Sequence, residues 1–427
     1  MNDRFPMVRY VPYMGVIWAT NEASKQGYYN GHPDWCNLGQ GQPEVGDIPG
    51  APPRIRDIAL TPQDQAYGPL GGTVEVRQAI CDFVNRTYRV GKSKYGIENV
   101  SFASGGRLAL TRLFSIFADG AWIGYKNPDY TAYEDYLNLL RQRCALIEVR
   151  ASEEEAFSIP PERFVQAIHQ EKLDAFVFSN PCNPTGEVIL GEDLRRYARA
   201  AREENCLLGV DEFYSQFIYE EDGSPAKRPS SILDYVEDIE NDPIVVFDGL
   251  TKGFRYPGWR AGWALGPAHV IEMINRAASA VDGGPSTCAE RAAIAALAPG
   301  QAEQEVEAVR AEFAVKRKML LEGLEKLGIR PKRAPLGTFY LWCSVEDLPG
   351  ELSDADNFFF ACLQEKVMTV PGHFFDIRPF RTRPAEEPYR HYVRFSYGPD
   401  RATIAKALER IGKVVKGSFD SAVLRSG

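Results

Sequence analysis

The feature that most constrains this chain is a regular alternation of short apolar runs with longer helical patterns, between about residues 100 and 270. Short apolar runs bounded by turn residues are typical of buried strands, and strands that alternate with helices are typical of βαβ units around a parallel sheet. Strands are predicted at "AWIGY" (121–125), "CALIEV" (144–149), "DAFVFS" (174–179), "CLLGVD" (206–211), "PIVVFDG" (243–249) and "RAGWAL" (260–265). Helices are predicted after Gly106, from about Tyr130 and over 191–204. We therefore expect an α/β fold, with a large domain whose mostly parallel central sheet is flanked by helices.

A different pattern begins near residue 301. Helical periodicity covers 301–328 and ends at a glycine, and "GTFYLWCSV" and "HYVRFSYG" further on resemble strands. This order predicts a second, smaller α+β domain. The expected division is an N-terminal arm that also belongs to the small domain (1–50), a large domain (51–300) and a C-terminal small domain (301–427).

The charge balance and the distribution of apolar residues exclude several classes of protein. The chain has 49 basic and 58 acidic residues, and the net charge of −9 disfavours binding to nucleic acid or to anionic membranes. No signal-peptide core and no apolar run of about 18 residues occurs, so a cytoplasmic protein is expected. The eight cysteines form no C-x-x-C pair and the five histidines are dispersed, so no metal site is expected.

Four short stretches have residue choices that are unusual for a scaffold. Each lies at the end of a predicted strand, where open α/β sheets bind their ligands. They are "SGGRLAL" (104–110), "SNPCNPTGEVI" (179–189), "GVDEFYSQF" (209–217) and "DGLTKGFRYPGWRAGW" (248–263).

The first three stretches each suggest a polar contact. Gly105 and Gly106 would let backbone N–H groups approach a phosphate at a helix start. The two Asn-Pro pairs form a rigid loop that can fix Asn183, and Asp211 ends an apolar strand three residues before Tyr214. A buried carboxylate at that place needs a partner. Taken alone, the first motif is more typical of an ordinary helix start, the second is as compatible with a turn, and a helix N-cap remains the alternative for the third.

The fourth stretch contains one lysine, Lys252, and an arginine eight residues later, Arg260, with a turn at Pro257 and Gly258 between them. A lysine and an arginine on two arms of one loop can meet at a common anion. For this stretch alone, a solvated surface lysine is the alternative.

Taken together, the four stretches resemble the class I/II aminotransferases, which are pyridoxal-phosphate enzymes of fold type I. The resemblance runs from "NLGQGQP" (37–43) to "YVRFSYG" (392–398). Its most specific element is K-x5-G-x-R-x-G, which occurs here together with N-P-x-N-P-T-G and D-x-x-Y. The resemblance implies a pyridoxal 5′-phosphate cofactor and a homodimer with shared active sites.

The resemblance also implies roles for the polar residues around the cofactor ring. Lys252 matches the lysine that forms the internal aldimine and later moves the substrate's α-proton. Asp211 matches the carboxylate that pairs with the pyridinium nitrogen, and Asn183 and Tyr214 match the pair that binds the phenolic oxygen. Arg260 matches the arginine that binds the cofactor phosphate.

Further positions match the phosphate site and the face of the ring. Gly105, Gly106 and Arg107 fall where the family's phosphate-cradling helix begins. Tyr130, in "NPDYTAY", matches the aromatic residue that stacks on the ring. Thr251, beside the lysine, is also expected to bind the cofactor.

Three matches concern the substrate and the second subunit. Arg394, in "HYVRFSYG", resembles the arginine that grips the substrate's α-carboxylate, and Gly41 matches a backbone contact to the same group. Tyr67, in "AYGPLGG", looks like the tyrosine that reaches the phosphate of the neighbouring subunit.

The sequence departs from the family pattern at three places. Family members often carry a hydroxyl residue three positions before the lysine, where this chain has Gly249, so one phosphate ligand is expected to be lost or replaced. The cofactor chemistry does not explain 282–284, Asp-Gly-Gly, in a region where relatives approach the partner's active site. The loop with Arg378, Arg381 and Arg383 borders the family's substrate pocket, and either binds an anionic or large polar substrate or is a solvated surface loop.

The leading functional hypothesis is an aminotransferase that moves an amino group from an L-amino acid to a 2-oxo acid, as part of amino-acid metabolism or biosynthesis. The alternative is a non-transaminating enzyme of the same fold that performs elimination, replacement, cyclisation or oxidation, because the same cofactor residues serve all of these. A third hypothesis, a non-catalytic sensor of a transcription factor, is disfavoured because no basic DNA-binding segment accompanies the domain.

Overall fold

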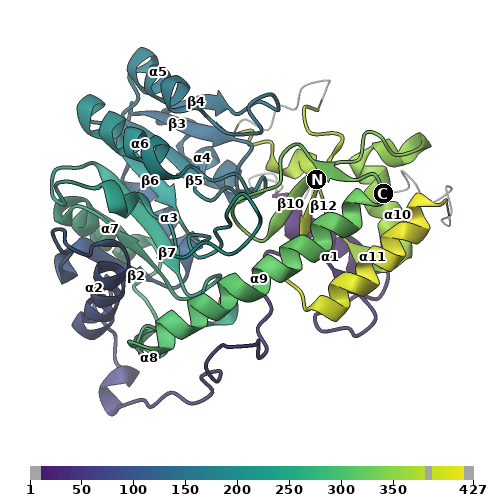
Figure 1. Ribbon diagram of the computed structural model, residues 1–427. Helices are drawn as coiled ribbons and strands as arrows, with labels where there is room; N and C mark the ends of the chain where they lie inside the picture. Colours follow the sequence, from purple (N-terminus) through teal and green to yellow (C-terminus); the bar gives the residue numbers. More distant parts are fainter. Residues whose placement is uncertain (1–10, 380–386, 418–427) are drawn as a thin grey trace, which may run out of the picture.

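The computed structural model describes residues 11–379 and 387–417. It has a large lobe and a smaller one, and the long helix α9 (Gln301–Glu325) runs from one to the other (Figure 1). Arg381 and Arg383 of the arginine-rich loop lie outside the described residues.

The large lobe is built on a seven-stranded sheet with the order β2-β8-β7-β6-β5-β3-β4. All neighbouring strands are parallel except β8, which is antiparallel to β2 and β7. The strands are β2 (Val100–Ala103), β3 (Trp122–Asn127), β4 (Ala145–Arg150), β5 (Ala175–Ser179), β6 (Leu207–Asp211), β7 (Ile244–Gly249) and β8 (Gly262–Leu265). The prediction of a mostly parallel central sheet is confirmed, and all six predicted segments contain a strand.

Helices cover both faces of this sheet because its strands are apolar on both sides. In β5, Ala175 and Val177 belong to one buried cluster, and Phe176 and Phe178 to the other. The first face is covered by α3 (Gly106–Ile116), α4 (Ala132–Leu140) and α7 (Ala268–Val281). The second is covered by α2 (Val74–Tyr88), α5 (Pro161–Glu171), α6 (Gly191–Glu204) and α8 (Thr287–Ala296).

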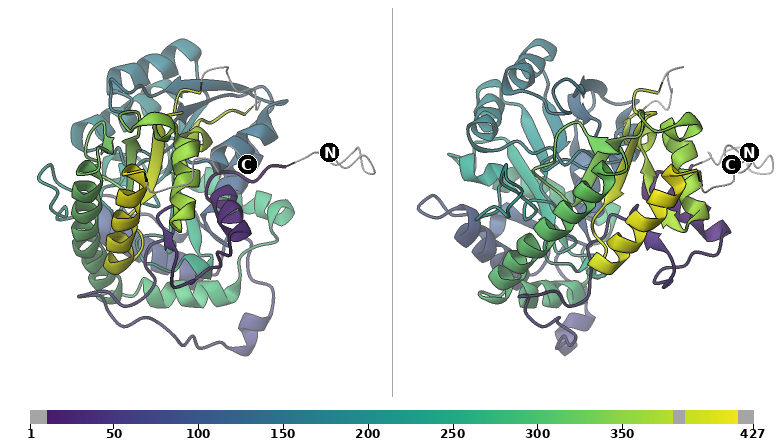
Figure 2. Two further views of the ribbon diagram at one scale, coloured as in Figure 1. Left: turned by 90° about the vertical axis from the view of Figure 1, so that its right-hand side faces the viewer. Right: turned by 45° about the vertical axis from the view of Figure 1, so that its right-hand side comes forward.

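The small lobe confirms the expected α+β unit. Its four-stranded sheet has the antiparallel order β12-β13-β10-β9, with β9 (Arg330–Pro331), β10 (Tyr340–Ser344), β12 (Val370–Pro371) and β13 (Tyr392–Ser396). A short parallel pair, β1 (Cys36–Asn37) and β11 (Val367–Met368), and the helices α10 (Ala355–Gln364) and α11 (Arg401–Val415) complete it. Helices α9 and α11 lie side by side (Figure 2).

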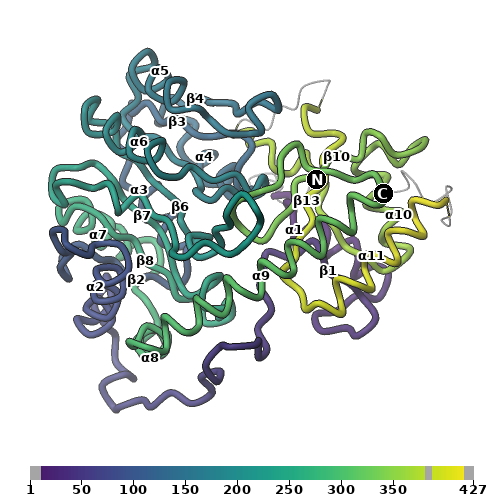
Figure 3. The backbone as a smooth tube through the Cα atoms, in the orientation of Figure 1, coloured from purple at the N-terminus to yellow at the C-terminus, as the bar shows by residue number. Residues whose placement is uncertain are grey.

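The N-terminal helix α1 (Gly15–Lys25) packs on this small lobe, although it is distant in sequence from most of it. Its Trp18 ring lies 4.9 Å from the rings of both Phe359 and Phe374. The chain then crosses to the large lobe through an extended segment before α2, which follows the outside of the molecule (Figure 3). Within 11–379 and 387–417, no helix combines the length and the apolar composition that a membrane span requires.

Candidate active site

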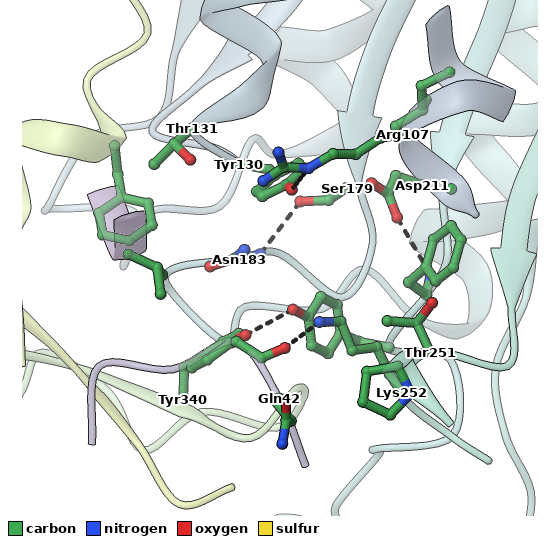
Figure 4. A pocket seen from close by; sticks show the side chains of 18 of the residues that line it. Gln42, Arg107, Tyr130, Thr131, Ser179, Asn183, Asp211, Thr251, Lys252 and Tyr340 are labelled. Atoms are coloured by element: carbon green, nitrogen blue, oxygen red, sulfur yellow. Dashed lines mark hydrogen bonds between the residues drawn. The ribbon is translucent and has the colours of Figure 1, made fainter. Parts of the chain in front are cut away.

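A cavity of about 550 Å³ lies where the two lobes meet, next to the carboxyl ends of the parallel strands. Residues of both lobes and of α1 line it (Figure 4). Of the residues that the sequence singles out, the lining includes Gly41, Gly106, Arg107, Tyr130, Asn183, Asp211, Tyr214, Thr251, Lys252, Arg260 and Arg394. Segments that are up to about 350 residues apart in sequence therefore meet at one site.

The topology of the sheet explains this convergence. Ser179 and Asp211 are the last residues of β5 and β6 and are register partners in adjacent parallel strands. Gly106 begins α3 directly after the strand β2, so its backbone N–H faces the same edge. Lys252 follows the end of β7. A ligand at this edge would meet a helix start, a carboxylate and an amine.

Lys252 is enclosed by the cavity wall rather than solvated. Its Nζ donates to the carbonyl oxygen of Gly41 and lies 5.7 Å from the centre of the Tyr214 ring and 6.0 Å from that of Phe339. Burial, and then the positive charge of Arg394, lowers the pKa of the amine from 10.5 to about 7. A large fraction of the amine is therefore neutral near pH 7, which is the form in which a lysine is nucleophilic.

Asp211 lies at the floor of the cavity and has few partners. The backbone N–H of Phe213 donates to its Oδ1 at 3.3 Å, and the hydroxyl of Tyr133 donates to its Oδ2 at 3.5 Å. Burial raises the pKa of this carboxyl from 3.8 to about 7. Such a group gains a favourable interaction from a cationic N–H placed in the cavity, because the charge would offset its burial.

Arg394 is buried on β13 and points into the cavity from the small lobe. It donates from Nη1 to Asn183 Oδ1 at 2.8 Å and from Nη2 to the carbonyl oxygen of Gly39 at 2.6 Å. Its guanidinium lies 4.1 Å from the centre of the Tyr340 ring. The Nε atom is buried and has no hydrogen-bond partner among the described residues, so one donor of this arginine is left for a ligand.

Tyr340 is a residue of the site that the sequence did not reveal. It lies on β10, and its hydroxyl oxygen is 2.7 Å from that of Tyr214, so the two phenols share a hydrogen bond across the two lobes. Figure 4 shows Tyr340 beside Lys252 and Gln42. The only sequence signal was an aromatic residue in a predicted strand, which is also what an ordinary core residue looks like.

The sequence also did not reveal a buried network of polar residues behind Asn183. Asp129 accepts hydrogen bonds from the backbone N–H and the hydroxyl of Ser179, and Ser179 Oγ accepts from the backbone N–H of Asn183 at 3.2 Å. Burial raises the pKa of the Asp129 carboxyl to about 6, opposed by the nearby Lys126. These hydrogen bonds fix the loop that carries Asn183.

Arg107 and Tyr130 form one wall of the cavity. Arg107 Nε donates to the Tyr130 hydroxyl at 3.0 Å, and Figure 4 shows the arginine reaching over the tyrosine. Met14, Val16 and Ile17, at the start of α1, line the cavity and are apolar. The sequence did not predict that these three residues line the cavity, because the position of α1 depends on its packing against the small lobe.

Four glycines allow close contact between the segments around the start of α3. A Cβ atom at Gly105 would lie 2.3 Å from Arg260 Nη2, and one at Gly106 would lie 2.3 Å from the Phe213 ring. A Cβ at Gly262 would lie 2.7 Å from the backbone nitrogen of Gly106. At Gly249, a Cβ would lie 2.5 Å from the carbonyl oxygen of Ala261. The absence of a hydroxyl residue at position 249 therefore has a packing reason.

Restoring the family's hydroxyl at this position should destabilise the protein. In Gly249→Ser, the side chain meets backbone atoms of β8 that cannot move independently, so we expect a loss of about 1–3 kcal/mol in the free energy of unfolding. Chemical denaturation measures it. Gly258→Ser is the matched control nine residues later, because no described heavy atom other than those of its chain neighbours lies within 4 Å of a Cβ there. Equal stability of the two variants would contradict this explanation.

The remaining sequence-based candidates lie elsewhere. Tyr67 is fully exposed and does not line the cavity of its own chain. Asp282 receives hydrogen bonds from Arg112 Nε at 3.1 Å and Nη2 at 3.0 Å, and from the backbone N–H of Gly284 at 3.1 Å, and so pairs with an arginine that is buried in α3. Gly283 and Gly284 have φ values of +71° and +100°, which form the turn after α7. Arg378 donates to the carboxylate of Asp376 at 2.7 Å.

Comparisons with known proteins agree with this geometry. Residues 33–411 match the family "Aminotransferase class I and II". The chain is 30% identical over 386 residues to the aspartate/prephenate aminotransferase of Thermus thermophilus, covering 90% of this chain and 91% of that protein. It is 28% identical over 422 residues to the valine–pyruvate aminotransferase of Mycobacterium tuberculosis, covering 96% and 98%. The structure of aspartate aminotransferase from Thermus thermophilus with maleate superposes with a TM-score of 0.75, at 26% identity, covering 97% and 99% of the two chains.

Proposed function

The chain belongs to the class I and II aminotransferases and is an aminotransferase, and from this premise we propose that it binds pyridoxal phosphate at Lys252. The observation that carries the proposal is the arrangement of three groups around one cavity: the Lys252 amine, the Asp211 carboxylate and the Arg394 guanidinium. The enzyme moves an amino group from an L-amino acid to a 2-oxo acid.

The residues present fit this cofactor. Asp211 is a buried carboxyl at the strand end that forms no ion pair within the described residues, which suits a ring N–H. The start of α3 and the Arg260 side chain supply donors for a phosphate, and Tyr130 supplies an aromatic wall. When bound, pyridoxal phosphate supplies a covalent anchor for the amino group and draws electrons from the substrate's α-carbon.

Each protein group then has a defined task. Lys252 Nζ accepts the α-proton and returns it, because the cavity holds its amine partly neutral near pH 7. Arg394 holds the α-carboxylate through the donor that lacks a partner, and the backbone of Gly41 approaches the same group. Tyr214, with Tyr340, and Asn183 donate to the phenolic oxygen of the cofactor.

A panel of L-amino acids, with pyruvate and 2-oxoglutarate as acceptors, tests the function. The donors include aspartate and valine, and the 2-oxo acid prephenate is added to the acceptors, because relatives are named for these substrates. We expect a 2-oxo acid to be released from the donor and a new amino acid to form in equal amount. Release of ammonia or of an eliminated side chain, with no new amino acid, would contradict transamination.

The pH dependence of cofactor attachment follows from the lowered pKa of Lys252. The neutral amine attacks the cofactor's aldehyde, so the attachment rate should rise with pH up to about 7 and level off above about 8. An ordinary lysine would continue to gain up to its usual pKa near 10.5. Stopped-flow mixing of the apoprotein with pyridoxal phosphate between pH 5.5 and 9.5 measures the attachment rate. Nα-acetyl-lysine, whose side-chain amine is free, is the control. A rate that still rises tenfold per pH unit above 8 would exclude the lowered pKa.

A homodimer completes the proposal. Tyr67 is fully exposed in the extended segment before α2, and the described part of its own chain gives it no hydrogen bond. In this arrangement the tyrosine reaches the phosphate bound by the other subunit. Sedimentation velocity of the holoenzyme checks the expected dimer.

A further inference from the structure

Arg255 is a fully buried arginine three residues after Lys252, and the proposed chemistry gives it no role. Its backbone adopts φ = +58°, a conformation that non-glycine residues adopt only when surrounding contacts hold them there. Its backbone N–H donates to the carbonyl oxygen of Lys252 at 3.1 Å. The arginine is thus part of the turn that presents the lysine.

The Arg255 side chain connects this turn to two other segments. Nε and Nη2 donate to the two carboxylate oxygens of Glu305, on α9, at 2.8 and 3.3 Å. Nη1 donates to the carbonyl oxygens of Glu44, at 3.2 Å, and Gly46. A planar guanidinium can satisfy a carboxylate and two carbonyls at once, whereas an ammonium group cannot match this geometry.

A second arginine, Arg54, binds both Glu305 and the turn that contains Arg255. Arg54 Nη1 donates to Glu305 at 2.9 Å and Nη2 to the carbonyl oxygen of Arg255 at 2.8 Å. Its guanidinium stacks 3.6 Å from the centre of the Tyr256 ring. The turn after Lys252 is therefore held on both sides by groups that carry charge and are shielded from water.

Arg255 binds the 39–46 loop, which lines the cavity through Gly41 and Gln42. Its first residue, Gly39, is held by Arg394 at 2.6 Å, and its far end is held by Arg255. Gly41, between these two anchors, contacts Lys252 Nζ. The position of Gly41 relative to the lysine and to Arg394 thus depends on both arginines.

We propose that Arg255 is a positioning residue for substrate binding: by tying the 39–46 loop to the Lys252 turn and to Glu305, it holds Gly41 where the substrate's carboxylate binds. The inference rests on the proposed function, because Gly41 and Arg394 are taken there as the carboxylate contacts. A contact that is equally strong in the bound substrate and in the transition state acts on KM more than on kcat.

The first arm of the test measures the loop itself, in the apoprotein. In Arg255→Ala, hydrogen–deuterium exchange in peptides that cover 39–46 and 253–257 should become at least tenfold faster. Arg89→Ala is the matched control, because Arg89 is also fully buried and donates to backbone carbonyls, those of Leu233 and Val236, away from the cavity. Unchanged exchange at 39–46 in Arg255→Ala would overturn the proposal, as would equal acceleration there in Arg89→Ala.

The second arm measures kinetics with the best amino donor of the panel. We expect KM to rise about tenfold in Arg255→Ala with kcat within threefold, and a smaller rise in Arg255→Lys. Arg255→Gly removes the side chain but suits the positive φ, so it should raise KM as alanine does. A normal KM in Arg255→Gly would assign the effect to backbone strain and overturn the proposal. Lack of transamination by the wild type would refute the proposed function, whereas the exchange arm would still test the loop.

Discussion

Replacing Lys252 by alanine should reduce kcat/KM for amino-group transfer by about four orders of magnitude or more, because the variant loses both the covalent attachment point and the proton carrier. The fold should persist. Within the described part of the chain Lys252 forms no salt bridge, and removing an amine whose burial lowers its pKa to about 7 removes a desolvation cost. Circular dichroism and thermal unfolding of the apoprotein check this part.

Two further measurements make the Lys252 assignment specific. Borohydride reduction of the wild-type holoenzyme, followed by peptide mapping, should place the cofactor on the peptide that contains Lys252. Lys252→Arg keeps a positive charge in the cavity but lacks a nucleophilic amine, so it should be as inactive as the alanine variant. More than about 1% of wild-type activity in either variant would contradict the assigned role.

Replacing Asp211 by asparagine should lower kcat/KM by about 10²- to 10³-fold. An amide keeps the size of the side chain but cannot carry the negative charge that favours a protonated ring nitrogen. The carboxyl's pKa of about 7 reflects burial, which the Phe213 N–H and the charge of Lys252 offset only in part, and a bound ring N–H would pull that pKa down further. Steady-state kinetics with the best donor measures the effect.

Asp248→Asn is the matched control for Asp211→Asn. Asp248 is also buried at the carboxyl end of a sheet strand, but it does not line the cavity, and burial raises its pKa to about 8. At pH 7 this carboxyl is mostly protonated, so an amide changes little charge. We expect kcat/KM to stay within about threefold of wild type. Similar losses in both variants would assign the effect of Asp211→Asn to general disruption of the strand ends.

The sequence predicted the central sheet well because its strands are continuous apolar runs bounded by turns. Helix α6 was predicted with its observed bounds, since its polar and apolar residues alternate with a clear helical period. The strand β2, expected before "SGGRLAL", was given no bounds, because four residues before a glycine pair carry little periodic signal. Helix α1 was not predicted either. Its buried face consists of small residues, and its place is decided by the aromatic cluster around Trp18.

The candidate site was predictable where a residue lies in a local motif, as at Lys252 and Asn183. It was not predictable where the site depends on contact between the lobes. Tyr340 is positioned by Tyr214, which is 126 residues away in sequence, and Arg255 by Glu305, which is 50 residues away. No spacing rule identifies such partners. Asp282 illustrates the opposite case: its unusual sequence context has a structural cause, the buried Arg112.

The close packing of Gly105, Gly106, Gly249 and Gly262 restricts how this chain can change over time. Gly106, Gly249 and Gly262 face backbone or ring atoms of another segment, and Gly105 faces the Arg260 guanidinium, so a side chain added at one position requires a compensating shift at a second. Single substitutions at these glycines are therefore disfavoured, because a protein with only one of the two required changes would be less stable. We expect variation that alters the reaction to enter instead through the small lobe and α1, which line the facing wall of the cavity. The glycine corner can be inherited as a unit while that facing wall diversifies.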